Sequence, residues 1–495
     1  MTSELLDAVI VGAGFGGIGA AIQLKRMGYQ DFVILDREDD LGGTWHVNRY
    51  PGLAVDVPTT TYSYYFEPNP NWSRLYSTGD EIKQYAADVA DKYDVRKHMR
   101  FNTLVEGACW DEENEVWRVT LAGGETLSAR YLITATGFLS QPNTPEIPGI
   151  ESFAGRIIHT TAWDNTYDLD GRRVAVIGTG ATAVQLIPEL AKKAADLTVY
   201  QRTPVWVVPR LDFPIPKPVK RLFSRVPLTQ RALRAVTDVI YEFFLFVGLR
   251  HRQLLFRRLN VAASDVAKMH RFFSVRDREL RMQLTPDYDF GCKRPTFSNS
   301  YYRVFTKPNV HLQSSGIEHI EPDGVVSADG TKTQIDTLVL ATGFNLWEAN
   351  IPAIEIIGRK GRNLGKWWRD TRFQAYQGVT VPYFPNYLSM ASPYAFLGLN
   401  FFNTVEYQMR HMDRLFGEMK RRGATTFEVT EEANARYLDR MTKLMGNSVF
   451  MAGNCADSRS YYFDPNGEAT LLQPVATRRA IKEASQYPLS DYRIA

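Results

Sequence analysis

Two parts of the chain show the same order of apolar and polar positions. The run 8–11 is apolar, a glycine-rich turn follows, apolar residues then recur at helical spacing, and a second apolar run ends before Asp36. The order returns at 174–177, which leads through another glycine-rich turn to an apolar run at 197–200. Short apolar runs bounded by glycine predict buried strands, and the helical spacing between them predicts a crossover helix. The pattern predicts an α/β protein with two βαβ units.

The first glycine-rich turn has the spacing of a dinucleotide cradle. It reads Gly12-x-Gly14-x-x-Gly17. The first glycine allows a tight turn, the second lets the backbone approach a pyrophosphate, and the third lets helix and strand pack closely. Asp36 follows Gly12 by 24 residues, where a carboxylate can bind the hydroxyls of a ribose. We expect this Rossmann-like unit to hold a nucleotide with a free ribose.

The second turn differs from the first in the residue that meets the ribose. It reads Gly178-x-Gly180-x-x-Ala183, and the position 24 residues after Gly178 is Arg202, followed by Thr203. A carboxylate would repel a 2′-phosphate at this place, whereas an arginine binds one. One such turn alone could be a chance cluster of glycines, but here both have the strand, the helix and the fitting residue. We expect the second unit to hold NADP.

Two later segments repeat each other and follow the two cradles. RYLITATGF (130–138) and DTLVLATGF (336–344) are apolar runs that end in Ala-Thr-Gly-Phe. Glycine at such a strand end lets the backbone pass close to a cofactor, although an ordinary strand ending in a turn would look similar. The repetition favours a protein with two nucleotide sites.

The segment 213–284 predicts a helical insertion with a basic surface. Between Lys217 and Arg281 it has 15 Lys and Arg against 5 Asp and Glu, interleaved with aromatic and aliphatic residues. Its longest apolar stretch, 235–249, is too short to span a bilayer and contains two acids, so we interpret it as a buried helix. The insertion either docks on a membrane or is a solvated cover of the site. We favour the cover.

Composition narrows the class of protein. The 495 residues carry a formal net charge of +3, which does not suggest a nucleic-acid binder. Cys109, Cys292 and Cys455 lack metal-ligand or CxxC spacing, so we expect no metal and no disulfide framework, as in a reducing compartment. The first apolar run is a strand and not a signal peptide, so we expect a cytoplasmic protein.

Two longer stretches are more specific than the glycines. FAGRIIHTTAWD (153–164) and GTWHVNRYPGLAVD (43–56) match the fingerprints FxGxxxHxxxW(P/D) and GxWxxxx(F/Y)PGxxxD. The matching positions are Phe153, Gly155, His159, Trp163 and Asp164 in one, and Gly43, Trp45, Tyr50, Pro51, Gly52 and Asp56 in the other. On these motifs the chain resembles the type I Baeyer–Villiger monooxygenases, class B flavin monooxygenases, from Asp7 to about Asp464.

The resemblance implies FAD and NADPH as cofactors and an apolar ketone or sulfide as substrate. NADPH would reduce FAD, the reduced flavin would capture O2 as a C4a-peroxide, and this anion would convert a ketone to an ester or lactone. Such an anion needs a fixed positive charge and little water around it. A flavin monooxygenase that oxidises nitrogen or sulfur is the alternative, because it would use the same oxidant in its protonated form.

The catalytic residues implied by the resemblance are Arg294, in GCKRPTFSNSYYRVF, and Asp56, which would orient it. Arginine keeps its charge when desolvated, as this role requires. Lys293 matches the family position that helps to hold the 2′-phosphate; a solvated Lys-Arg pair is the alternative. The further cofactor-binding candidates are Gly12, Gly14, Gly17, Asp36, Gly43, Thr44, Trp45, Asp56, Tyr62, Gly178, Gly180, Thr182, Ala183, Gln185, Arg202 and Thr203.

Two positions stay open at this point. His159 lies between the two units, where it either acts on their relative movement or only satisfies hydrogen bonds at their interface. Many family members carry a tryptophan in a C-terminal loop, whereas this chain reads AGNCADSRSYYFDPNGEAT with Tyr461 and Tyr462, either of which could replace it. Substrate preference is therefore not given by the resemblance.

The expected organisation is two nested domains. We expect an FAD-binding domain in 1–148 and 348–495, an NADP-binding domain in 149–209 and 292–347, and the helical insertion in 210–291. A pyridine-nucleotide disulfide reductase would need a redox cysteine pair near the flavin, and no two of the cysteines are close in sequence. A flavin-binding sensor without turnover is disfavoured because Arg294 and Asp56 are both present.

Overall fold

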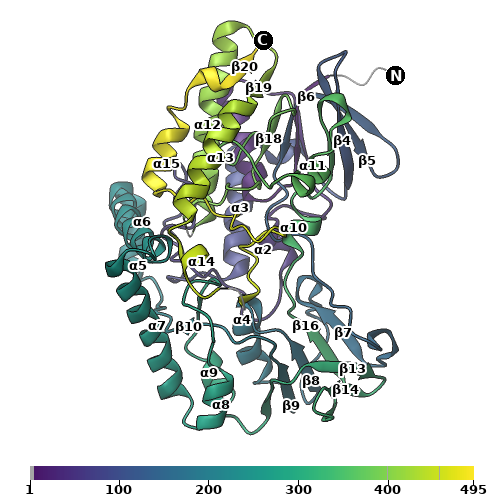
Figure 1. Cartoon of the computed structure of the whole chain (residues 1–495), viewed down its shortest axis with the longest axis vertical. Coiled ribbons are helices and arrows are strands. Elements are labelled where there is room, and N and C mark those ends of the chain that lie inside the picture. The colour runs from purple at the N-terminus through teal and green to yellow at the C-terminus, as the bar shows by residue number, and fades with distance from the viewer. Residues whose placement is uncertain (1–4, 399, 456–457) are drawn as a thin grey trace.

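The computed structural model describes residues 5–398, 400–455 and 458–495, which form two lobes with a layer of helices along one side (Figure 1). The upper lobe has an 8-stranded sheet in the order β17-β4-β5-β6-β1-β2-β3, with β18 paired to β6. Its strands are β1 (Leu6–Val11), β2 (Phe32–Leu35), β3 (Met99–Arg100), β4 (Val105–Asp111), β5 (Val116–Leu121), β6 (Thr126–Thr134), β17 (Glu355–Ile357) and β18 (Tyr387–Ser389). β1 runs parallel to β2 and β6, as a βαβ unit requires.

Helices from both ends of the chain cover this sheet. They are α1 (Phe15–Met27), α2 (Thr44–Val47), α3 (Gly79–Lys92), α10 (Leu346–Ala349), α11 (Leu364–Asp370), α12 (Phe401–Arg422), α13 (Glu431–Met445), α14 (Val449–Ala452) and α15 (Thr477–Ala484). The buried faces of α1 and α12 share one core cluster with β1 and β2, which joins the N-terminal and C-terminal parts of the sequence. The last strands, β19 (Phe427–Val429) and β20 (Tyr492–Ile494), pair antiparallel beside it.

The lower lobe has a five-stranded parallel sheet in the order β12-β9-β8-β16-β7. Its strands are β7 (Arg156–His159), β8 (Arg173–Ile177), β9 (Asp196–Tyr200), β12 (Val310–Gln313) and β16 (Thr337–Leu340), with α4 (Ala181–Leu190) crossing from β8 to β9 and α9 (Tyr301–Val304) before β12. An antiparallel meander of β13 (Ile317–Glu321), β14 (Gly324–Ser327) and β15 (Lys332–Gln334) lies beside it, and β10 (Val207–Val208) pairs with β11 (Thr296–Phe297). The predicted α/β class with two βαβ units is confirmed.

The helical layer is the predicted insertion. It consists of α5 (Lys217–Arg225), α6 (Pro227–Leu249), α7 (Leu254–Ser274) and α8 (Arg278–Gln283), which leave the lower lobe after β9 and return to it before β12 (Figure 1). The prediction of a buried helix at 235–249 is only half right. One face of α6 is buried, but Val236, Val239, Ile240, Phe243 and Phe244 on the other are 47–58% exposed. The sequence pattern indicated an apolar helix but did not show which of its faces packs against the rest of the protein.

Each glycine-rich turn is closed by the strand that ends in Ala-Thr-Gly. A Cβ built on Gly12 would lie 2.5 Å from the carbonyl oxygen of Ala135, and one on Gly178 would lie 2.3 Å from that of Ala341. Both glycines have positive φ, +111° and +118°. The repeated motif therefore packs its alanine carbonyl against the first glycine of each cradle, which explains why the two features occur together. Among the described residues, no helix is both long and apolar enough to cross a membrane.

The close approach of Gly17 to Gly12 provides a test of the packing in the first cradle. A Cβ on Gly17 would lie 1.8 Å from the carbonyl oxygen of Gly12, so Gly17→Ala must push α1 away from β1. We expect a loss of stability of about 2 kcal/mol or more by overpacking, with loss of bound nucleotide. The matched control is Gly417→Ala on α12, where the Cβ meets nothing within 4 Å and the change should be neutral or stabilising. Equal melting temperatures for the two variants would contradict this packing account.

Candidate functional site

The first cradle lies at the carboxyl end of β1. The carboxylate of Asp36 accepts hydrogen bonds from the backbone N–H groups of Ala13, at 2.6 Å, and of Glu38, at 3.0 Å. Both contacts aim the acid at the turn where an adenosine ribose would lie. A Cβ on Gly14 would meet the Cα of Gly43 at 3.5 Å, so the loop that opens the second fingerprint closes over this cradle. Its backbone is bare on the side that a pyrophosphate would approach.

The second cradle lies at the carboxyl end of β8. Ala183 is fully buried against the strand, and a Cβ on Gly180 would meet nothing within 4 Å, so the turn is open where a phosphate would sit. The hydroxyl of Thr179 donates to the carbonyl of Thr203 at 2.8 Å, which holds the loop after β9 against the turn. Arg202 is exposed beside it. The predicted residues of this cradle are therefore gathered at one place.

Three cations, Arg202, Lys293 and Arg459, lie near one another beside the second cradle. Burial, together with the charges of the nearby Arg202 and Arg459, lowers the pKa of Lys293 to about 8. Burial, and then Arg459, also lowers the pKa of Arg202. A bound anion would offset the repulsion between these like charges, so this cluster fits a phosphate. Arg459 was not predicted as a site residue, although it lies in the C-terminal loop in which Tyr461 and Tyr462 had been noted.

Arg294 and Asp56 form a two-pronged ion pair between segments 238 residues apart. Nε of Arg294 donates to Oδ2 of Asp56 at 2.6 Å, and Nη2 donates to Oδ1 at 2.9 Å. Burial by itself would lower the pKa of Arg294, but the charge of Asp56 and the adjacent Tyr462 raise it above its already high value. The guanidinium is therefore a fixed positive charge at every working pH. Tyr461 and Tyr462 lie near this pair; Tyr462 is buried, which raises the pKa of its hydroxyl, whereas Tyr461 is 40% exposed.

The loop that carries Asp56 is held against the lower lobe. Tyr50 donates its hydroxyl to Oε1 of Gln185 on α4 at 3.0 Å, and Nε2 of Gln185 donates to the carbonyl of Ala54 at 2.9 Å. Thr182 lies against the same hydroxyl, and burial raises the pKa of Tyr50 to about 12. Gln185 and Thr182 were predicted to bind cofactor, and the structure uses their side chains to tie the loop 50–54 to the lower lobe.

Aromatic side chains shield the other side of the Asp56–Arg294 pair. Nε1 of Trp45 donates to the hydroxyl of Tyr62 at 3.1 Å, and their rings meet edge to face. Burial raises the pKa of Tyr62, and both charges of the pair act on its hydroxyl. Tyr241 of α6 reaches the same place, where its hydroxyl lies 3.4 Å from that of Tyr76. The inner face of α6 thus forms a wall of the site, as expected of an insertion that covers it, although Tyr241 itself was not predicted. Thr44 opens the short helix α2 beside Trp45.

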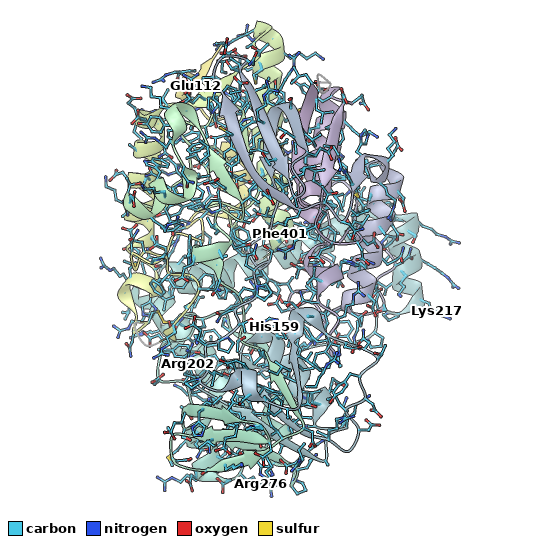
Figure 2. All side chains as sticks on the ribbon, turned by 90° about the vertical axis from the view of Figure 1, so that its right-hand side faces the viewer. Glu112, His159, Arg202, Lys217, Arg276 and Phe401 are labelled. Carbon is cyan, nitrogen blue, oxygen red and sulfur yellow. A yellow bond between two sulfur atoms is a disulfide. The ribbon has the colours of Figure 1, made fainter. Side chains whose placement is uncertain are left out.

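The fingerprint at 153–164 is anchored in the lower lobe. Phe153 is buried on one side of the parallel sheet, and Trp163 is buried on the other beside α4. Between them, His159 ends β7 and lies at the junction of the two lobes (Figure 2). Its Nδ1 pairs with the hydroxyl of Thr161 at 2.7 Å, while its Nε2 is buried without a hydrogen bond to any described residue. Burial lowers the pKa of His159, which favours the neutral form of the ring.

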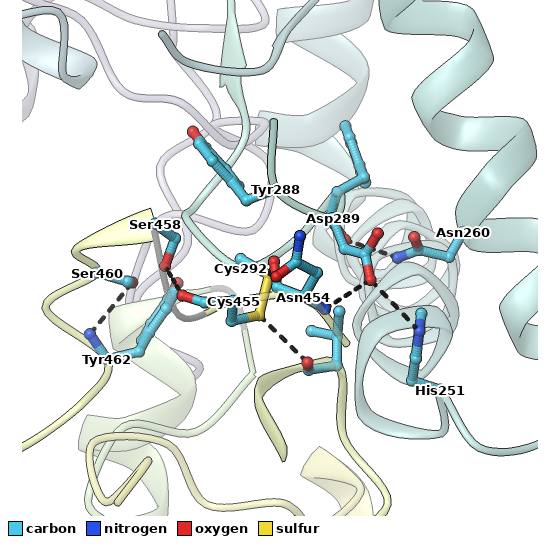
Figure 3. The surroundings of a disulfide bond; sticks show 12 residues. His251, Asn260, Tyr288, Asp289, Cys292, Asn454, Cys455, Ser458, Ser460 and Tyr462 are labelled. Atoms are coloured by element: carbon cyan, nitrogen blue, oxygen red, sulfur yellow. Dashed lines mark hydrogen bonds and ion pairs between the residues drawn. A yellow bond between two sulfur atoms is a disulfide. The ribbon is translucent and has the colours of Figure 1, made fainter. Parts of the chain in front are cut away.

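A disulfide joins Cys292 to Cys455, which contradicts the expectation of no disulfide (Figure 3). The two cysteines are 163 residues apart, and only the fold brings them together. Cys292 directly precedes Lys293 and Arg294, and Cys455 begins the loop toward Tyr461, of which residues 456–457 lie outside the described part. The bond therefore clamps the Arg294 segment to the C-terminal loop. Sequence spacing could not show this, because it reports only neighbours along the chain.

These features define an oxidoreductase with two dinucleotide sites, and residues 9–215 match the pyridine nucleotide-disulphide oxidoreductase family. A Baeyer-Villiger monooxygenase of Streptomyces coelicolor is 36% identical, over 99% of this chain and 93% of that protein. Cyclohexanone monooxygenase from Rhodococcus sp. Phi1 bound to NADP+ superposes with a TM-score of 0.88 at 28% identity, covering 100% and 99% of the two chains. OTEMO in complex with FAD and NADP gives 0.86 at 28%, covering both chains fully. The chain belongs to the Baeyer–Villiger monooxygenase family.

The clamp can be tested by its effect on stability. Breaking the bond with a reductant, or by Cys455→Ser, releases a loop of more than 160 residues and should destabilise the fold by about 2–4 kcal/mol. The measurement is the melting temperature with and without reductant. Cys109→Ser is the matched control, because Cys109 is exposed and free. A Cys455→Ser protein that melts at the wild-type temperature would contradict a stabilising role of the bond.

Proposed function

We propose that the chain is an FAD-containing, NADPH- and O2-dependent monooxygenase that converts ketones to esters or lactones. Full-length similarity to named Baeyer–Villiger monooxygenases supports this reaction. The single observation that carries the proposal on this chain is the ion pair of Arg294 with Asp56, held at the junction of the two cradles. The exclusion of a disulfide reductase on cysteine spacing alone no longer holds, but the relatives are monooxygenases over the whole chain.

The residues present fit both cofactors. When bound, FAD takes a hydride from NADPH and lets one oxygen atom of O2 pass to the ketone. In our proposal 1–148 and 348–495 hold FAD, with Gly12, Gly14 and Asp36 around its adenosine half. The segments 149–209 and 292–347 hold NADP, with Gly178 and Gly180 at its pyrophosphate. The cluster of Arg202, Thr203, Lys293 and Arg459 takes the 2′-phosphate, which matches the lowered pKa values of Arg202 and Lys293.

Arg294 has the electrostatic role in this proposal. Its guanidinium would stabilise negative charge on the reacting oxygen and on the ketone oxygen as the new bond forms. Asp56 fixes the plane of the guanidinium through both of its oxygens, so the charge is oriented before substrate arrives. Tyr62, Tyr241 and Tyr462 restrict the access of water to the pair, whose side chains are 20% and 30% exposed. Because a fixed cation favours a deprotonated oxidant, we propose apolar ketones as the main substrates and sulfides as poorer ones.

A cytoplasmic location is part of the proposal, and the disulfide bears on it. The cytosol keeps most thiols reduced, so a stable bond there must be shielded. Cys292 is 0% exposed and Cys455 is 3% exposed, which restricts attack by small thiols. The bond is therefore compatible with a reducing compartment, although it was not expected from the sequence.

Replacing Arg294 should separate ketone oxygenation from NADPH consumption. We expect Arg294→Ala to lower the rate of lactone formation from cyclohexanone by about 100-fold or more, because a preorganised charge is lost. Oxidation of NADPH should continue within a few-fold and yield hydrogen peroxide. The measurement is product and peroxide per NADPH, with bound FAD and melting temperature recorded for each variant.

Two further variants make this result interpretable. Arg303 lies in the same segment and is exposed, so Arg303→Ala should behave like the wild type. Asp56→Asn keeps the shape of the partner but weakens its hold on the guanidinium, so an intermediate loss is expected. Full lactone yield in a folded, FAD-loaded Arg294→Ala protein would remove this arginine from the mechanism.

The lowered pKa of Lys293 predicts a pH dependence of NADPH binding. In the free protein Lys293 loses its proton near pH 8, whereas a bound 2′-phosphate favours the protonated form. The KM for NADPH should therefore rise as the pH increases above about 8, and the KM for NADH, which lacks the phosphate, should not. Arg202→Gln should narrow the preference for NADPH over NADH. Parallel pH profiles for the two nucleotides would contradict this placement.

A further inference from the structure

The helix α6 turns several polar side chains inward and a row of apolar side chains outward. On the inner face, Nε2 of Gln230 donates to the carbonyl of Asn69 at 2.6 Å, and Nη1 of Arg234 donates to the carbonyl of Ser63 at 2.8 Å. Asp238 is held beside Arg234 at 3.5 Å. The opposite face presents Val236, Val239, Ile240, Phe243 and Phe244 to solvent. This is the reverse of the pattern that a helix on a water-exposed surface normally shows.

The neighbouring helix α7 has the same inverted pattern. Asn260, Ser264 and Arg271 are buried, and Nδ2 of Asn260 donates to the carbonyl of Phe290 at 2.7 Å. The outward side carries Leu254, Leu255, Val261, Val266, Met269, Phe272 and Phe273, which are 50–75% exposed. With Leu228 and Leu233 of α6 included, the two helices expose fourteen large apolar side chains on one layer of the molecule. An apolar area of this kind marks a surface that meets something other than water.

Basic residues surround this apolar face. On α5, α6, α7 and the turns beside them, the exposed cations are Lys217, Arg221, Arg225, Arg231, Arg250, Arg252, Arg257, Arg258, Lys268, Arg276 and Arg278. Lys217 lies at the outer edge of the molecule (Figure 2). The segment from Lys217 to Arg281 has 15 basic and 5 acidic residues, whereas the rest of the chain has 43 basic and 50 acidic residues. The positive charge of the protein is thus concentrated where its exposed apolar side chains are.

We propose that the outer face of α5–α7 docks on an anionic lipid surface. Phenylalanine and aliphatic side chains would enter the boundary between headgroups and acyl chains, and the lysines and arginines would contact the anionic headgroups. A second copy of the chain is disfavoured by charge complementarity, because a two-fold contact through this face would bring basic helices together. This surface is independent of the proposed reaction.

The docked orientation places the site near the lipid. The inner face of α6 lines a small cleft with Asp238, Tyr241 and Glu242, closed on the other side by Val57 and Asn400. Tyr241 is also the residue that reaches the Asp56–Arg294 pair. One helix therefore separates the site from the proposed lipid surface, where apolar ketones would be most concentrated.

The test is vesicle flotation of the FAD-loaded full-length protein. At low salt we expect about tenfold more protein with vesicles of 30% phosphatidylglycerol in phosphatidylcholine than with phosphatidylcholine alone, and this difference should shrink in 0.5 M NaCl. No binding to either vesicle, or equal binding to both, would overturn the proposal. Flotation needs no turnover, so its failure is distinct from a failure of the proposed reaction.

Surface variants separate the apolar and basic contributions. Phe243→Ser/Phe244→Ser should reduce binding to anionic vesicles by about tenfold, and Arg257→Gln/Arg258→Gln should reduce it and weaken its salt dependence. Leu104→Ser, at an exposed position of the upper lobe that is 49% accessible, is the control and should bind like the wild type. Sedimentation equilibrium tests whether a second copy of the chain binds this face instead. A dimer that dissociates in the Phe243→Ser/Phe244→Ser variant would assign the face to a second copy and overturn the proposal.

Discussion

The two-pronged pair of Arg294 and Asp56 is the interaction on which the rest of the site depends. Asp56 lies on a loop after the first cradle, and Arg294 follows the helical insertion, so the pair forms only when both lobes and the insertion are in place. Gln185 holds the Asp56 loop to α4, and the Cys292–Cys455 bond holds the Arg294 segment to the C-terminal loop. A buried charge costs stability unless it is paired, and here both partners are fixed before any ligand binds.

Sequence reasoning recovered features that are local in the chain. The strands, the two glycine turns and the residue 24 positions later each follow from spacing, and the structure closes both turns with the repeated Ala-Thr-Gly strands. Arg459, Tyr241 and the disulfide were missed because their positions depend on contacts between segments far apart in sequence. The roles of Gln185 and Thr182 illustrate the same limit. A family motif can mark a residue as important, while its contacts here show it bridging the lobes.

The helical insertion has two surfaces with different tasks. Its inner face contributes Tyr241 to the wall around the ion pair, and its outer face concentrates apolar and basic side chains. Sequence pattern alone favoured a buried helix and a solvated cover, because periodicity reports an apolar stripe without showing which side meets the protein. The inward hydrogen bonds of Gln230, Arg234 and Asn260 decide the orientation. Polar contacts therefore help to fix these helices to the lobes, together with the buried Leu245, Leu249 and Ala267.

The central proposal is that oxygen passes from O2 to a ketone at the site of Arg294 and Asp56. The most direct measurement is turnover of cyclohexanone with NADPH under ¹⁸O2, followed by mass spectrometry of the product and assay of hydrogen peroxide. The account predicts a lactone that carries one ¹⁸O atom and forms in proportion to NADPH consumed. Consumption of NADPH with stoichiometric peroxide and no labelled lactone, across cyclic, linear and steroid ketones, would contradict it.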